Sequence, residues 1–116
     1  MLKRFIIILI LTLIKITIGQ IHFNTSEKLQ GYKLEDGDVY FVFDENIYAV
    51  IPDKIVIEGS FRNWDHNMDD TRWWLQKSDQ QGIWFLKAPQ LIDPGSQFKF
   101  RINDGDWINP PSDASN

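Results

Sequence analysis

The feature that most constrains the fold of this chain is a series of short segments in which apolar and polar residues alternate. In the clearest segment, 97–103, three apolar residues alternate with three polar ones: Phe98, Phe100 and Ile102 with Lys99, Arg101 and Asn103. A period of two is typical of a half-buried strand. The chain contains six or seven such short segments in all, spaced about 8–12 residues apart and separated by Gly, Pro and Asp turns. The sequence therefore predicts an all-β fold, an antiparallel β-sandwich with immunoglobulin-like topology.

The segment 54–64 (KIVIEGSFRNW) carries a second signal. Ile55 and Ile57 continue the alternation of a strand, and Gly59 predicts a sharp bend because it lacks a Cβ. Trp64 lies beyond the strand, among polar residues, where no alternation requires a core side chain. A strand that ends by presenting an indole among hydrogen-bonding groups is suited to binding a sugar.

Four further strands are expected, at 39–43, 47–51, 71–77 and 83–88. Trp84 lies in an apolar strand and is predicted to be in the core. Trp73 shares the inward side of its strand with Leu75 and is also predicted to be buried. Trp74 then points outward, as an additional binding platform or as part of a partner surface.

The first 19 residues are predicted to be a secretory signal peptide. A basic start precedes the apolar run Phe5–Ile14, and small residues precede Gln20, the expected mature N-terminus. The alternative is a retained membrane anchor, but the apolar run of about 14–16 residues is shorter than the roughly 20 that a spanning helix needs. We expect a secreted or periplasmic protein without a stable membrane anchor. Its mature part divides into an N-terminal arm at 20–37 and one β-sandwich domain at 38–116.

The mature chain is acidic. Removal of Lys3, Arg4 and Lys15 with the signal peptide leaves nine of the twelve basic residues against sixteen acidic ones, a net charge of −7. Such a charge repels phosphate groups, which argues against nucleic acid as a partner. The chain contains no cysteine, so no disulfide can stabilise it after export.

The residues offer little catalytic chemistry. His22 and His66 are far apart and have no cysteine partners, so zinc-site spacing is absent. The acidic pairs Asp69-Asp70 and Asp104/Asp106 could suggest a glycosidase pair or a calcium site, but aspartate is also common in turns. We expect a non-catalytic domain without metal or cofactor.

Five short motifs then occur in an order that resembles a known family: Gly59–Trp64 (GSFRNW), Gly82-Ile83-Trp84, Asp93-Pro94-Gly95, Gln97–Phe100 (QFKF) and Asp104–Trp107 (DGDW). Together they resemble carbohydrate-binding module family 48, which includes the glycogen-binding domain of the AMP-activated protein kinase β subunit and isoamylase N-terminal modules. The resemblance covers residues 55–111. It implies an early-set, immunoglobulin-like sandwich that binds an α-glucan of the starch or glycogen type.

The resemblance also implies which residues contact sugar. The tryptophan that ends the GSF motif corresponds to Trp64, the lysine of the later strand to Lys99, and the tryptophan after the Asp-Gly turn to Trp107. Asn63, a polar residue beside Trp64, and Trp74, an outward-pointing aromatic residue, are further candidates for contact with sugar.

The chain departs from the family pattern in two ways. Asn103 looks inserted between the lysine and the second tryptophan. The closing strand of the family is expected to be missing, or replaced in part by the strand at 39–43.

Two functions remain open at this point. The first is α-glucan binding by a module that is accessory to a glycoside hydrolase. The alternative is a structural early-set domain that packs against a catalytic neighbour, with its tryptophans in that interface. An enzyme in its own right is the third, less favoured option.

Overall fold

The computed structural model describes residues 21–110, and the predicted signal peptide lies outside that range. Seven strands form the fold: β1 (Tyr32–Glu35), β2 (Asp38–Asp44), β3 (Ile55–Gly59), β4 (Gln76–Lys77), β5 (Ile83–Lys87), β6 (Phe98–Ile102) and β7 (Asp106–Ile108). Four short helices accompany them: α2 (Thr25–Gln30), α3 (Glu45–Tyr48) and the 3-10 turns η1 (Ser60–Arg62) and η2 (Thr71–Trp73). None of the helices within this range is long and apolar enough to cross a membrane.

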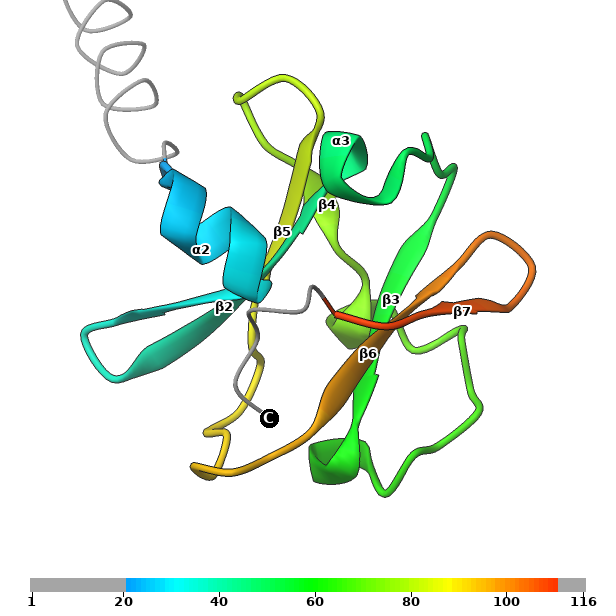
Figure 1. The fold of residues 1–116 in the computed structure, drawn as a ribbon. Coiled ribbons are helices and arrows are strands. Elements are labelled where there is room, and N and C mark those ends of the chain that lie inside the picture. The colour runs from blue at the N-terminus through cyan, green and yellow to red at the C-terminus, as the bar shows by residue number, and fades with distance from the viewer. Residues whose placement is uncertain (1–20, 111–116) are drawn as a thin grey trace, which may run out of the picture.

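The strands pair into two antiparallel sheets (Figure 1). The larger sheet has the order β1-β2-β5-β4, and the smaller has the order β3-β6-β7. Lettered A to G in chain order, these are the ABED and CFG sheets of a constant-type immunoglobulin domain. The predicted all-β, immunoglobulin-like sandwich is therefore confirmed. β7 forms one edge of the smaller sheet, and the expectation of a missing last strand stays a prediction.

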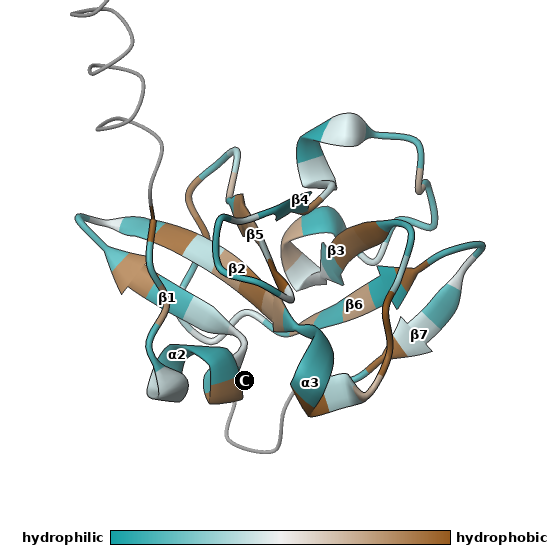
Figure 2. Ribbon diagram, turned by 90° about the horizontal axis from the view of Figure 1, so that it is seen from above, coloured by the Kyte–Doolittle hydropathy of each residue, from teal (hydrophilic) through white to brown (hydrophobic). Residues whose placement is uncertain are grey.

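The core lies between the two sheets. Its buried residues come from both sheets, from η2 and from the segment after η2: Phe41, Phe43, Ile55, Val56, Ile57, Trp73, Leu75, Trp84, Phe98, Phe100 and Ile102. Figure 2 shows hydrophobic strand segments facing one another across the sandwich, with hydrophilic turns at its ends. The predictions that Trp73 and Trp84 are core residues are confirmed.

The segment predicted as an N-terminal arm is part of the fold. Phe23 is fully buried against Val42 and Ile83, on the outer side of the larger sheet. The side chain of Gln80 holds it there, because it bonds both the Phe23 N–H (2.8 Å) and the Phe23 carbonyl (3.1 Å). α2 follows with a capping box at Asn24, and β1 then pairs with β2. The sandwich thus includes residues before 38, in contrast to the expected boundary.

The strand predicted at 47–51 is wrong. Residues Glu45–Tyr48 form α3, with the Asp44 side chain accepting a hydrogen bond from the Asn46 N–H (2.9 Å). The Glu45 carboxylate also accepts a hydrogen bond from Trp84 Nε1 (2.8 Å), which anchors the helix to β5. A short apolar run has no period that distinguishes helix from strand, and the cap decides the outcome here.

Gly59 has a different role from the predicted bend. Its φ of 175° is extended backbone that any residue can adopt. A Cβ at this position would instead overlap the ring of Phe61 and the carbonyl oxygen of Gln97. Glycine is required here for close packing.

The strand predicted at 71–77 is shorter than expected. The chain first makes η2, then a single bridge between Trp74 and Val56, and then the two-residue strand β4. The bridge pairs Trp74 with β3 of the smaller sheet, whereas β4 belongs to the larger sheet. The chain therefore passes from one sheet to the other between Trp74 and β4.

Candidate functional site

The candidate site lies on the outer face of the smaller sheet. Lys99 is opposite Glu58 in the β3–β6 register, and Arg101 is opposite both Val56 and Trp107. Residues directly opposite in antiparallel strands point to the same side. All five side chains therefore project from the outer face of the smaller sheet, although Val56 also belongs to the main buried cluster.

A loop covers the β3 part of this face. Val56 and Glu58 are outward-pointing residues, yet both are completely buried. The chain from η1 to η2 folds back across them, and Arg62 fixes it in place. Arg62 Nη1 donates to the Ile57 carbonyl (2.9 Å) and Nη2 to the Asn67 carbonyl (2.8 Å). The surface that remains open is the β6–β7 part of the sheet and the rim of this loop.

Glu58 is a buried carboxylate under this loop. Its Oε2 lies 3.1 Å from Arg62 Nη1, but neither oxygen has a hydrogen-bond partner among the described residues. Burial raises the pKa of Glu58 above its ordinary value, and the charge of Arg62 opposes this in part. The pair holds the loop from beneath and does not face solvent.

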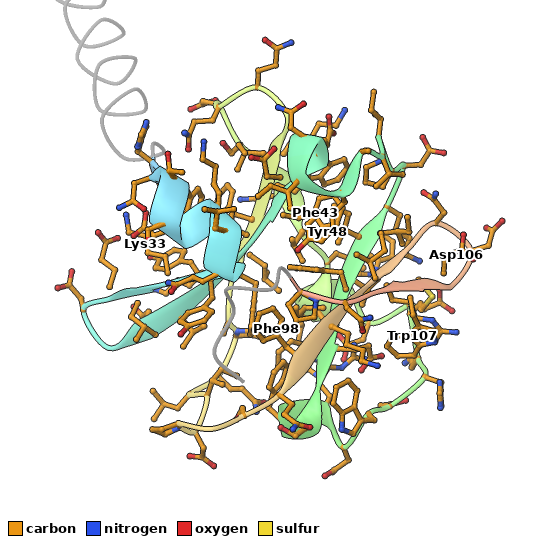
Figure 3. All side chains as sticks on the ribbon, viewed as in Figure 1. Lys33, Phe43, Tyr48, Phe98, Asp106 and Trp107 are labelled. Atoms are coloured by element: carbon orange, nitrogen blue, oxygen red, sulfur yellow. The ribbon has the colours of Figure 1, made fainter. Side chains whose placement is uncertain are left out.

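Trp107 is the main exposed aromatic of the face, with 42% of its surface accessible. The guanidinium of Arg101 lies 4.7 Å from the ring centroid, and the His66 ring meets the indole at 84° with centroids 6.2 Å apart. Figure 3 shows Trp107 projecting from β7 beside the loop that follows η1. β7 is an edge strand of the described sheet, so no strand lies beyond Trp107 on that side.

Lys99 lies diagonally across from Trp107, on the neighbouring strand and one side-chain row away. Diagonal neighbours of this kind have Cα atoms about 7–8 Å apart, within reach of a long side chain. Lys99 is exposed and has no ion pair or hydrogen bond to another residue in the range 21–110. Its ammonium is available to a ligand on Trp107.

Asn63 and Trp64 lie at the end of β3, directly after η1. The Trp64 N–H bonds the Gly59 carbonyl (3.1 Å) and the Asn63 N–H bonds the Ser60 carbonyl (3.0 Å). Both residues have left-handed backbone, with φ of 52° for Asn63 and 53° for Trp64. This conformation is unfavourable for a bulky side chain such as tryptophan. Asn63 is exposed and Trp64 is half-buried. The turn that holds them follows Gly59, which pairs with Phe98, the neighbour of Lys99.

Trp74 is separated from Trp107. It lies on the far side of the loop, where its Nε1 donates to the Met68 carbonyl (2.7 Å) and the Lys54 ammonium is 4.3 Å from its ring centroid. Segment 66–68 runs between the two indoles, because His66 contacts Trp107 and Met68 contacts Trp74. Trp74 is 36% exposed and forms a separate aromatic surface.

Sequence reasoning missed Arg101 and His66. Arg101 shares the outward alternation of Lys99, and that pattern could have identified it. No sequence signal indicates His66, because its contact with Trp107 depends on how the loop folds. The described residues contain no cluster of three or more His, Cys, Asp or Glu side chains that could hold a metal ion.

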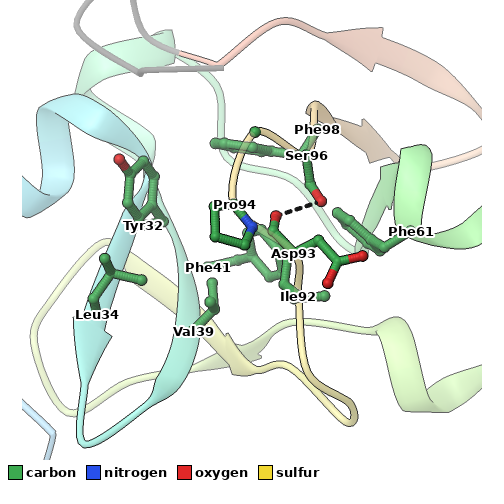
Figure 4. A pocket seen from close by; sticks show the side chains of 11 residues that line it. Tyr32, Leu34, Val39, Phe41, Phe61, Ile92, Asp93, Pro94, Ser96 and Phe98 are labelled. Atoms are coloured by element: carbon green, nitrogen blue, oxygen red, sulfur yellow. Dashed lines mark hydrogen bonds between the residues drawn. The ribbon is translucent and has the colours of Figure 1, made fainter.

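An apolar groove of about 320 Å³ lies elsewhere, between the β1–β2 ribbon and the segment before β6 (Figure 4). It is lined by Tyr32, Leu34, Val39, Phe41, Phe61, Phe98 and residues 92–96. The Ser96 hydroxyl donates to the Asp93 carbonyl (2.7 Å) and closes the turn at one wall. Leu34 is 69% exposed. The groove is chemically unlike the tryptophan and lysine face.

Comparison with known proteins does not assign the chain to a family. No model of a protein family matches the chain, and no curated protein matches it.

Proposed function

We propose that this protein is a non-catalytic carbohydrate-binding module of an exported protein, and that it binds an α-glucan on the open β6–β7 face. The observation that carries the proposal is the arrangement of Trp107 and Lys99. An indole that is 42% exposed lies diagonally across from a lysine whose ammonium has no ion pair or hydrogen bond within residues 21–110. This pair offers a stacking surface and a hydrogen-bond donor, which are the two groups that a pyranose ring requires.

The arrangement of the neighbours supports the proposal. Arg101 lies against one side of the indole, so a sugar has a single face on which to stack. Trp64 and Asn63 follow the end of β3 that the register sets next to Lys99, and we propose that they contact sugars further along a chain. The motifs that resemble carbohydrate-binding module family 48 provide the reason to propose an α-glucan instead of another neutral sugar.

The expected affinity is modest. Covering one indole face removes about 50–80 Å² of apolar surface from water, worth about 1.5–2 kcal/mol. Two such contacts with a few hydrogen bonds, less the cost of association, give a Kd in the micromolar to millimolar range, as an order of magnitude. A module of this strength would localise a partner on a polysaccharide, which fits the role of an accessory to a glycoside hydrolase.

The alternative function is a structural domain that packs against a catalytic neighbour. The apolar groove favours it, because a groove with an exposed leucine at its side suits a protein segment better than a sugar. The two functions use different surfaces and can be tested separately.

Native affinity electrophoresis in gels that contain glycogen or amylopectin tests the proposal. We expect retardation of the wild type, a weaker effect for Trp107→Ala and Lys99→Ala, and no change for Lys87→Ala, an exposed lysine on the opposite sheet. Retardation should be nearly independent of salt, because the ligand is neutral. Wild-type protein that migrates equally with and without polysaccharide would overturn the proposal.

A further inference from the structure

Arg101 connects three parts of the candidate site. Its Nε donates to the Gly105 carbonyl (3.0 Å) and its Nη1 donates to the His66 carbonyl (3.3 Å). Its guanidinium also lies 4.7 Å from the centroid of the Trp107 ring. One side chain on β6 thereby joins the turn before β7, the loop after η1 and the exposed indole.

The turn before β7 is shaped to receive this side chain. Gly105 has a φ of 138°, a conformation that residues with a Cβ rarely adopt. A Cβ built on Gly105 would lie 3.1 Å from Arg101 Nη2 and 3.4 Å from Nε. The absence of a side chain at 105 lets the guanidinium approach the backbone at a position 4.7 Å from the centroid of the indole ring.

We propose that Arg101 is the positioning residue of the sugar site, which holds the Trp107 indole in a single orientation with one face open. That the ligand is a sugar rests on the proposed function. That Arg101 orders the indole concerns only the contact between Arg101 and Trp107. The guanidinium covers the β6 side of the ring and is fixed by two backbone carbonyls, so the ring has a rigid support. The sugar then stacks on the side that points beyond the sheet edge.

Lysine cannot take this role. A guanidinium is planar, can lie against an aromatic ring, and presents donors in a fixed fork, whereas an ammonium is a compact charge on a flexible stem. An indole without this support has to be ordered when the sugar binds. We expect this to weaken glucan binding by about fivefold to tenfold, the effect of immobilising one side chain.

The experiment compares Arg101→Gln and Arg101→Lys with the wild type, and Arg72→Gln, an exposed arginine on η2, serves as the control. The first measurement is the indole Nε1–H resonance of Trp107 in ¹⁵N-labelled protein without sugar, assigned through Trp107→Phe. The second is the Kd for maltoheptaose by titration, with the melting temperature as a check on folding.

We expect both Arg101 variants to shift or broaden the Trp107 resonance and to bind maltoheptaose about fivefold to tenfold more weakly. Arg101→Lys should not restore binding, and Arg72→Gln should behave as the wild type. An unchanged Trp107 resonance in folded Arg101 variants would overturn the positioning role, and so would wild-type affinity. If the wild type binds no glucan, the proposed function fails, and the resonance alone then decides whether Arg101 orders the indole.

Discussion

The carboxylate of Glu58 lies 3.1 Å from the guanidinium of Arg62, and both side chains are buried beneath the loop that leads from β3 to η2. Alternation places Glu58 on the outer side of its strand, where a charged residue usually meets water. Here the outer side is covered, and Arg62 also donates to one backbone carbonyl of β3, that of Ile57, and to one of the covering segment, that of Asn67. The pair therefore joins the strand to the loop that carries Trp64 and His66.

Glu58→Gln should change how stability depends on pH. Because burial raises the pKa of Glu58 in the folded state, the folded protein binds more protons than the unfolded chain between the two pKa values. The free energy of unfolding contributed by this group is therefore largest at low pH and falls as the pH rises through the raised pKa. Urea unfolding from pH 4 to 7 should show wild type gaining stability relative to Glu58→Gln as the pH falls. Glu35→Gln, on an exposed strand edge, is the control, and parallel curves for wild type and Glu58→Gln would contradict the prediction.

Asp70→Asn should have the opposite pH dependence. Hydrogen bonds from Arg72 lower the pKa of Asp70 from 3.8 to about 2. The stability that the charged carboxylate provides is present above pH 3.8 and is lost as the pH falls toward 2. The wild type should be the more stable protein at pH 7, and the difference should disappear near pH 2. Thermal unfolding in low salt measures this, with Asp69→Asn as the control. A difference that persists at pH 2 would argue against the mechanism.

Phe23→Ala should destabilise the fold by about 3–5 kcal/mol, because it removes a fully buried aromatic ring. The control is Leu29→Ala on the exposed side of α2, which should cost much less. Equilibrium urea unfolding at neutral pH distinguishes them. If residues before 38 were only a polar arm, the two variants would behave alike.

Gly59→Ala should cost about 1–3 kcal/mol through overpacking, since the new methyl group overlaps the Phe61 ring and the Gln97 carbonyl. The smaller side chain of Phe61→Leu should relieve part of the overlap, so the double variant should be more stable than the sum of the two single changes predicts. A double-mutant cycle by urea unfolding gives the coupling. Strict additivity would show that the ring of Phe61 is not the reason for the glycine.

Trp74→Ala should weaken binding only for long glucans. Trp74, Val56, Arg101 and Trp107 occupy one cross-strand row. Three strand spacings therefore separate the two tryptophans, or about 14 Å between Cα atoms. A short sugar on Trp107 does not reach Trp74 across segment 66–68. Titration with maltotriose and maltoheptaose should show an effect of Trp74→Ala for the longer ligand alone. An equal loss for both would place Trp74 in the same subsite as Trp107.

The sequence identified the parts of the fold that repeat a simple period. β2, β3 and β6 follow from alternation, and the core positions of Phe98, Phe100 and Ile102 follow with them. The segment 47–51 was misjudged, because an apolar run without a period fits helix and strand equally and the deciding bonds come from Asp44 and Trp84.

The site was predictable only in part. Outward alternation predicted Lys99 on the outer side of its strand, and the resemblance to carbohydrate-binding module family 48 implied that Trp107 lies beside it. The burial of Glu58 and the contacts of Arg101 with His66 depend on a loop that folds back over the sheet, and local pattern carries no information about that path. The separation of Trp74 from Trp107 follows from the strand order and register, which put the two residues at opposite ends of one row, and local pattern does not reveal that order either.

The burial of Phe23 also determines how the module can be attached to something else. Phe23 packs on the outside of the larger sheet, whereas Trp107 projects from the outside of the smaller one, so the Phe23 side and the proposed glucan site are back to back. A bead, a chip or a second domain fused ahead of residue 21 would therefore leave the proposed site uncovered. Immobilisation through that end is the natural format for capturing polysaccharide.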